Sequence, residues 1–303
     1  MKNMQVYSIL FLILMGLHLP CLSQEHVHVL TKKISKTFTY KNGEVLDLEA
    51  YKANVNISTW DRNEVQVNLN LVAKNLLKNI AEKELSYHKE FMYKKGTSIV
   101  LKNTIIIPEG TESVSSFLTA SYDIKLPSKA DIILNSKYGI SSVKNTNGTL
   151  FITSEYGQVI LRSNRGFVRV YTMFSDIDAR SISSRLTVNA EHAKISLNII
   201  GGEVSVNNKF GVIELAKLNG LERLDIEASK CEVHLMLKDF KAYNYNLSNA
   251  GSNIVFNTAY FIENSEPIPD QKFKRIFDSQ NPAINIKTSM KQIIIQDEKY
   301  TVY

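Results

Sequence analysis

Apolar and polar residues alternate through the middle of the chain, in a pattern that returns after about 18 residues. A large residue followed by a small one marks each copy: Tyr138-Gly139, Tyr156-Gly157, Phe174-Ser175, His192-Ala193 and Phe210-Gly211, with a sixth copy, Lys230-Cys231, after a slightly longer interval. Before Gly157 the apolar residues stand at even positions, and after it they stand at odd positions. Alternation is typical of a strand with one buried face, and the change of parity indicates a corner.

Each repeat therefore predicts two short strands joined by a bend and closed by a second turn, such as Asn164-Arg165-Gly166. One repeat cannot bury its apolar side alone, so the repeats must stack. We predict an all-β fold, a parallel β-helix or β-solenoid with about 18 residues per coil. Two core columns are expected: Ile132, Leu150, Val168, Leu186, Val204 and Leu224, and Leu134, Ile152, Val170, Val188, Val206 and Ile226.

The corner pairs carry a further expectation about packing. We expect the aromatic residue of each pair to fill the wide inner corner of its coil, and His192 to do the same. The glycine would be there to allow the bend. Cys231 stands in the glycine position, which predicts a small core or corner residue.

The regular repeats divide the chain into four parts. We expect a signal peptide at 1–23, irregular coils at 24–130, regular coils at 131–256, and a loop with a final coil as C-terminal cap at 257–303. Apolar residues between about 75 and 90 recur at helical spacing, which predicts a short helix covering the open end of the stack. Residues 104–120 and 257–282 are expected to be loops.

The start of the chain predicts export. Lys2 precedes an apolar run at 9–17, and small residues follow near Cys21 and Ser23, as in a secretory signal peptide. Cleavage before Cys21, as in a lipoprotein, is the alternative, but His18 and Pro20 fit that motif poorly. No later apolar run is long enough to span a membrane. We expect a protein of the periplasm or the cell surface.

Charge and cysteine content exclude several classes of function. Without residues 1–23, which hold one lysine, the chain has 35 basic and 30 acidic side chains. The basic residues are scattered, so we expect no nucleic-acid binding. Cys231 is then the one cysteine left, so no intramolecular disulfide can form.

Several segments of the sequence resemble a known family. These are Leu46-Asp47-Leu48, the run from Val55 to Val65, Tyr122-Asp123-Ile124-Lys125-Leu126-Pro127, and Asn135-Ser136-Lys137-Tyr138-Gly139. Together they resemble a bacterial family of exported β-strand-repeat proteins known as putative adhesins, which are related to the head domains of auto-transporter-like adhesins. The resemblance covers nearly the whole mature chain and implies a β-helix-like fold in the cell envelope. It implies no catalytic residues.

One outward-facing column could bind a ligand. Lys144, Arg162 and Arg180 recur at the spacing of the repeat, with Arg165 close by. Like charges stacked about 5 Å apart repel each other unless the side chains spread apart or an anion neutralises them. We hypothesise that this basic strip contacts an acidic glycan or a lipid headgroup. The alternative is a set of flexible side chains spread in water.

Signals for catalysis or metal binding are weaker. Asp176 and Asp178 lie beside Lys194 and Ser196, but no histidine joins them in the repeat, and exposed acids are usually simple surface residues. A new terminus at Gln24 would place His26 third, where it could chelate copper or nickel if the amine stays free. We expect no metal site and no cofactor.

The favoured hypothesis is an exported, non-enzymatic β-solenoid that serves as an adhesin or an envelope binding module. One alternative is a carbohydrate-active enzyme, similar to a polysaccharide lyase, with a groove formed by the two predicted loops. Another is a periplasmic structural or sensing partner that recognises an envelope protein by strand addition.

Overall fold

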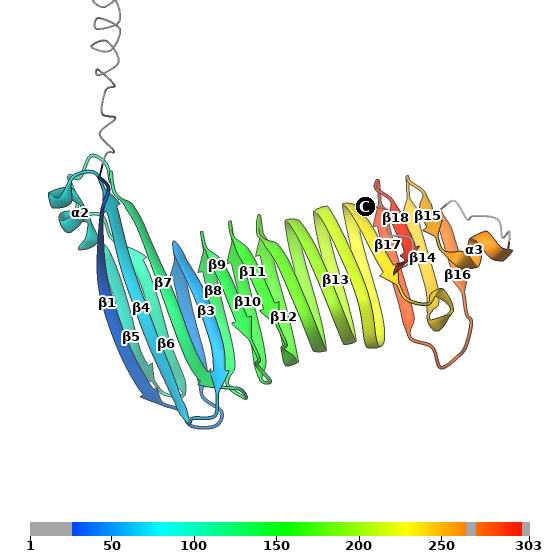
Figure 1. The fold of residues 1–303 in the computed structure, drawn as a ribbon, viewed down its shortest axis with the longest axis horizontal. Coiled ribbons are helices and arrows are strands. Elements are labelled where there is room, and N and C mark those ends of the chain that lie inside the picture. Colours follow the sequence, from blue (N-terminus) through cyan, green and yellow to red (C-terminus); the bar gives the residue numbers. More distant parts are fainter. Residues whose placement is uncertain (1–25, 265–270, 299–303) are drawn as a thin grey trace, which may run out of the picture.

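The computed structural model describes residues 26–264 and 271–298, which form an elongated all-β structure (Figure 1). This part of the chain holds 18 strands and two short α-helices. The strands lie in two rows along the long axis, called here the first row and the second row. A first-row strand, a corner and a second-row strand form one unit. The all-β prediction is confirmed, whereas the predicted signal peptide lies outside the described residues.

Backbone pairing fixes the order of strands in each row. The first row runs β5 (His88–Lys95), β6 (Ser98–Ile105), β2 (Val45–Tyr51), β8 (Asp131–Lys137), β10 (Thr149–Glu155), β12 (Arg165–Met173), β13 (Asp176–Leu237), β17 (Ala283–Ser289), β14 (Asn244–Ala250) and β16 (Lys272–Arg275). The second row runs β1 (His28–Thr39), β4 (Glu64–Asn75), β7 (Phe117–Pro127), β3 (Ala53–Trp60), β9 (Ile140–Lys144), β11 (Gln158–Arg162), β13, β18 (Ile293–Asp297) and β15 (Ile254–Asn257). The long strand β13 enters both rows, because it pairs with β12 and β17 in the first and with β11 and β18 in the second.

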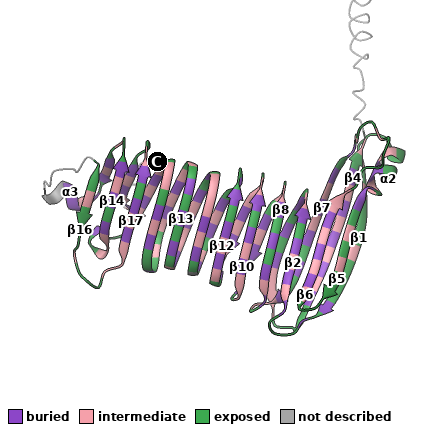
Figure 2. Cartoon of the chain, turned by 180° about the vertical axis from the view of Figure 1, so that it is seen from behind, coloured by how far each residue is buried: buried purple, intermediate pink, exposed green. Residues whose placement is uncertain are grey.

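Residues that are 18 apart in the sequence pair with each other in the central parallel strands, so the repeat spacing sets the register. Leu150 pairs with Ile132 on one side and with Val168 on the other, and Val168 pairs with Leu186. Both predicted core columns are buried, with each member at most 2% exposed. Buried residues alternate with intermediate or exposed ones along the central strands (Figure 2). Each buried aliphatic side chain contributes about 1.5–3 kcal/mol to stability.

The corner that leads from a first-row strand to the following second-row strand, called here the first corner, differs from the expectation. The second corner leads back to the first row. The turn is made by the large residue, not by the glycine: Tyr138, Tyr156, Phe174, His192 and Phe210 all have φ between 53° and 63°. This left-handed conformation directs their side chains outward, so Tyr138, Tyr156 and Phe174 are 44–46% exposed. The expectation that the aromatic residues and His192 lie in the core is wrong.

The small residue that follows points inward instead. A Cβ placed on Gly157 would lie 2.0 Å from the carbonyl oxygen of Gly139, because the previous unit passes directly beneath it. Ser175, Ala193 and Cys231 occupy the same position in other units and are buried. The prediction that Cys231 is a small core residue is therefore confirmed, and burial raises the pKa of its thiol to about 11.

One end of the rod is built from the N-terminal strands, in an order that departs from the sequence. β2 and β3 lie between the β6–β7 unit and the β8–β9 unit, and β4 and β5 lie further out and run antiparallel to their inner neighbours. The predicted helix is present as α2 (Lys78–Leu85), which packs against β4 and β1 at this end. Its Glu84 carboxylate accepts hydrogen bonds from the backbone amides of Ser115 (3.1 Å) and Ser116 (2.6 Å).

The other end also departs from sequence order. β17 pairs with both β13 and β14, and β18 pairs with both β13 and β15, so the last strands of the chain are inserted between two earlier units. β17 and β18 are therefore not the outer cap that was expected. The physical reason is the shape of the core: Ile284 and Ile286 continue the aliphatic columns of Leu224 and Ile226. The segment 257–282, expected to be a loop, contains the helix Ala259–Asn264 and the edge strand β16 at this end.

Aromatic residues close that end instead. Phe240, in the 3-10 turn Phe240–Ala242, contacts the rings of Tyr245, Phe256, Tyr260, Phe273 and Phe277. Tyr260 belongs to α3 (Ala259–Asn264). These large rings need more room than an aliphatic column offers, so they lie in the outermost unit. Neither helix of the described residues is long and apolar enough to cross a membrane.

Candidate functional site

A groove of about 420 Å³ opens on the outer side of the second row. Its polar lining comes from outward-facing positions of β11, β13 and β18: Arg162, Asp178, Arg180, Ser196, Asn198, Glu214, His234 and Gln296. These side chains face out because their neighbours in sequence, such as Leu161 and Ala179, are buried in the core. The groove is therefore a direct product of strand alternation and register.

The predicted basic strip lies at one side of this groove. Arg162 pairs in register with Lys144 on one strand and with Arg180 on the other, so the three residues form one column. Neighbouring strands are about 4.8 Å apart, which sets the spacing of the charges. Arg165 is not part of the column, since it begins β12 beyond the second corner, opposite Ser183. The structure thus brings together three of the four predicted residues.

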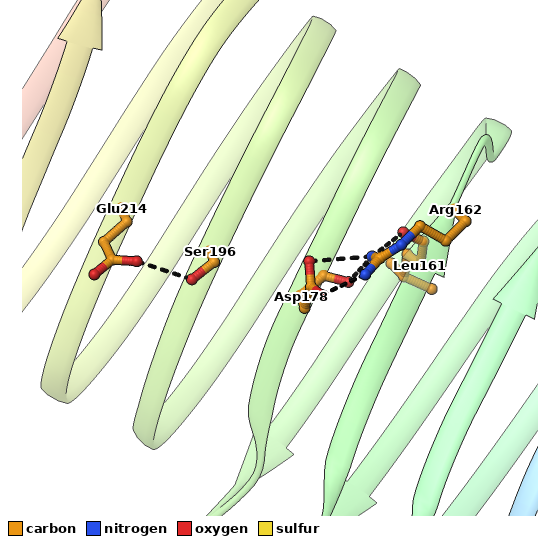
Figure 3. A network of polar contacts seen from close by, with 5 residues as sticks. All are labelled: Leu161, Arg162, Asp178, Ser196 and Glu214. Carbon is orange, nitrogen blue, oxygen red and sulfur yellow. Dashed lines mark hydrogen bonds and ion pairs between the residues drawn. The ribbon is translucent and has the colours of Figure 1, made fainter.

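Arg162 is fixed by a carboxylate of the protein itself (Figure 3). Its Nη1 donates to Asp178 Oδ1 (3.1 Å) and to the backbone oxygens of Asp178 (2.8 Å) and Leu161 (2.9 Å), and its Nη2 contacts Asp178 Oδ2. About a third of the Arg162 side chain remains exposed (32%), and such partly exposed ion pairs add at most about 1 kcal/mol to stability. Asp178 therefore neutralises the middle charge of the column without needing an outside anion.

Glu214 is held in a similar way further along the groove. Ser196 Oγ donates to its Oε2 (3.0 Å; Figure 3). Lys194 Nζ lies 2.9 Å from its Oε1. Asp176, the other acid considered from the sequence, accepts a hydrogen bond from the backbone amide of Lys194 (2.8 Å). Each carboxylate is thus bound to a neighbour in an adjacent unit.

From the sequence, His234 is expected to face outward alone; the structure confirms that it faces outward but gives it neighbours. It lines the groove in the same column as Asp178, Ser196 and Glu214, and its Nε2 lies 3.0 Å from Glu232 Oε1. The sequence contained the information that places His234 in this column, because position 234 follows position 214 by the same interval that separates Phe210 from Lys230. Among the described residues, no three His, Cys, Asp or Glu side chains are grouped as a metal site.

Comparisons with known proteins give only distant structural likenesses. Neither a protein-family model nor a curated protein matches the chain. A putative lipid binding protein from Parabacteroides distasonis is 12% identical, with a TM-score of 0.46, over 89% of this chain and 96% of that one. A putative adhesin from Bacteroides fragilis is 10% identical, with a TM-score of 0.41, over 87% and 97%. A putative cell adhesion protein from Clostridium sporogenes is 13% identical, with a TM-score of 0.28, over 89% and 100%. Likeness at this level carries no argument about function.

Proposed function

We propose that the chain is an exported β-solenoid, with about 18 residues per coil, that acts as a non-enzymatic binding module of the cell envelope, of the adhesin type. Its place would be the periplasm or the cell surface. The observation that carries this proposal is the column of Lys144, Arg162 and Arg180, which presents cations at a regular spacing on a hydrogen-bonded ladder.

A regular row of cations suits an acidic polymer, whose own charges repeat along its length. Arg162 is held in place by Asp178, whereas Lys144 and Arg180 are exposed and form no ion pair with another side chain of the described residues. They remain available for an acidic glycan or the headgroups of anionic lipids. Such binding would be electrostatic and would weaken as salt increases.

The test is binding of the purified chain to polygalacturonate and to heparin as acidic probes. We expect the variant Lys144→Gln, Arg162→Gln, Arg180→Gln to bind at least tenfold more weakly. A control variant with the same change in charge, Lys102→Gln, Arg185→Gln, Lys209→Gln, removes three cations from the first row and should bind almost as well as the wild type. An equal loss in both variants, or no binding by the wild type, would contradict the proposal.

One observation favours a carbohydrate-active enzyme as the second candidate. Asp178 and Glu214 stand in one column of one groove, two units apart, and His234 follows them. Most glycosidases use two carboxyl groups that flank the scissile glycosidic bond. Assaying the same polymers for new reducing ends distinguishes the two functions: a binding module releases none, whereas an enzyme releases products that Glu214→Gln abolishes.

A further inference from the structure

A second groove, of about 470 Å³, lies on the outer side of the first row, where β13, β17 and β14 run side by side. One column of its lining consists of Asn189, Asn207, Glu227 and Lys287. The next column contributes Ser205, Asp225 and Asn285. The outward-facing members of both columns are hydrogen-bonding side chains, and the volume is typical of ligand clefts.

Charges within this first-row groove are largely compensated. Asp225 pairs with Arg223 (Nε to Oδ2, 2.7 Å) and accepts a hydrogen bond from Asn285 Nδ2 (2.8 Å). Glu227 and Lys287 stand opposite each other in register, so their opposite charges are adjacent. A groove without net charge does not attract a polyanion, and its polar lining does not suit an acyl chain. Its amides, hydroxyls and carboxylates can donate and accept hydrogen bonds, as the hydroxyl groups of a sugar require.

An aromatic side chain continues the same column. Tyr171 pairs in register with Asn189 and is 44% exposed. Its ring stacks on no other ring of the described residues, in contrast to the corner aromatics, whose faces are covered by their neighbours. A free aromatic face beside hydrogen-bonding groups can pack against the apolar face of a pyranose ring. From Tyr171 to Lys287 the column crosses four strand spacings, roughly 19 Å.

We infer that this first-row groove binds a neutral polysaccharide chain lying along the long axis of the molecule, with Tyr171 stacking on one sugar ring and Asn189 and Asn207 hydrogen-bonding to its neighbours. The inference rests on the proposed binding function, but it assigns a second site, on the opposite row from the basic column, and a different class of ligand.

Isothermal titration of the purified chain with four neutral hexasaccharides, those of cellulose, laminarin, mannan and chitin, tests this site. We expect at least one to bind, and we expect Asn189→Ala with Asn207→Ala, and separately Tyr171→Ala, to weaken binding at least tenfold. Both changes are at outward positions and should not affect folding. Asn135→Ala, three units earlier in the same column as Asn189, is the control and should change the affinity less than twofold.

Each outcome bears on the inference. It is overturned if no hexasaccharide binds, or if binding survives unchanged in the Asn189 and Asn207 variant. If acidic polymers bind through Lys144, Arg162 and Arg180 while neutral sugars do not bind, the inference fails and the proposed function stands. If neutral sugars bind through the first-row groove while acidic polymers do not bind, the inference stands and the basic column loses its role.

Discussion

At each first corner, a large side chain adopts a conformation that usually belongs to glycine. The left-handed region costs a residue with a Cβ roughly 1–2 kcal/mol. The rings of neighbouring units offset this cost by stacking, with centroids 4.6–5.3 Å apart and planes within 14° from Tyr138 to Phe210. A stacked aromatic pair adds about 0.5–1.5 kcal/mol beyond the area that it buries. The stack of corner rings is therefore structural. It exposes ring edges, and the ring faces are covered by neighbouring rings, so they cannot stack on a ligand.

This account makes a prediction about Phe174, which stacks on Tyr156 and His192. Phe174→Ala should lower the free energy of unfolding by about 2 kcal/mol, because two stacked contacts are lost. Phe174→Gly should lower it by about 1 kcal/mol less, because glycine adopts the left-handed conformation without strain. Urea unfolding measures both values. If the glycine variant is the less stable one, the corner does not depend on its left-handed residue.

Gly157 gives a second prediction at this scale. Gly157→Ala should destabilise the protein by more than about 2 kcal/mol, because its Cβ would overlap the Gly139 carbonyl and the two units would have to move apart. Gly96→Ala serves as a control: no atom lies within 4 Å of the added Cβ, and its φ of 58° alone costs about 1–2 kcal/mol. Equal losses in thermal unfolding would mean that the units are not in close contact at Gly157.

The sequence was sufficient to locate each corner but not to say which residue makes it. A change of parity at Tyr156-Gly157 is explained equally well by a bend at the glycine or by a left-handed tyrosine. The first interpretation places the ring inside, and the second, which the structure shows, places it outside. Backbone conformation decides between them, and hydrophobic periodicity does not report it.

Among the elements, β5 begins with a buried histidine. His88 Nε2 lies 3.2 Å from the carbonyl oxygen of Val72 in β4. Burial lowers the pKa of His88 below its ordinary value of 6.5; the hydrogen bond to Val72 and the charge of Glu90 partly oppose this, and Lys32 adds to it. The unfolded chain therefore takes up the proton at higher pH than the folded one.

The free energy of unfolding therefore depends on pH through the titration of His88. Stability is lost as pH falls below about 6.5, since the unfolded state binds more protons there. We expect His88→Gln to flatten this dependence between pH 6.5 and 5. Urea titrations at several pH values measure the slope. A wild-type slope that persists in His88→Gln would contradict this prediction.

The inserted strands β17 and β18 provide a prediction by truncation. Deletion of 283–303 removes the only described parallel partners of β14 and β15, leaving those strands without support from β13. Hydrogen exchange should then accelerate at 244–257, and also at 221–237, whose outer edge is uncovered. If 283–303 were only a terminal cap, its deletion would leave 244–257 paired with 221–237, and both segments would stay protected. Fast exchange in both segments therefore supports the inserted order, and slow exchange in both would contradict it.

The sequence could predict the strands of this end but not their order. Ile284, Ile286, Ile293 and Ile295 alternate as expected, and all four are buried. However, an isoleucine-rich strand fits any aliphatic column, so the local pattern does not name its partner. The order is decided by which residues can close the end, namely the aromatic rings around Phe240.

For the whole molecule, the open end of the two rows must be protected from other strands. At the N-terminal end, β1 and β5 are the outermost strands of the described residues, and lysines reach across between them. Lys32 Nζ lies 2.6 Å from Glu90 Oε1, Lys36 Nζ donates to Met92 O (2.6 Å), and Lys94 Nζ donates to Thr39 O (3.0 Å). Charged side chains placed on edge strands prevent edge-to-edge pairing.

Replacing these three lysines should therefore change the state of association. We expect Lys32→Thr, Lys36→Thr, Lys94→Thr to form dimers or larger species that the wild type does not form at the same concentration. Light scattering after size-exclusion chromatography measures this, with Lys33→Thr, Lys74→Thr, Lys125→Thr as a control of equal charge. The same mass for both variants would show that the lysines do not protect the edge.

At this scale the sequence also predicted part of the candidate site. The repeat spacing placed Lys144, Arg162 and Arg180 in one column, as the register shows. The carboxylate that neutralises Arg162 was not predicted, because Asp178 lies in the next unit and reaches Arg162 diagonally. Side-chain conformation determines such contacts, and spacing alone does not.

The insertion of strands at both ends determines the order in which the molecule can assemble during synthesis. The central units can form one after another, since each needs only the unit before it. The gap between β13 and β14 can be filled only when the last residues have emerged, and β2 and β3 likewise wait for β7 and β8, which follow them in the chain. The rod would therefore grow from its middle and complete its two ends last, leaving the terminal apolar surfaces in need of protection until synthesis is finished.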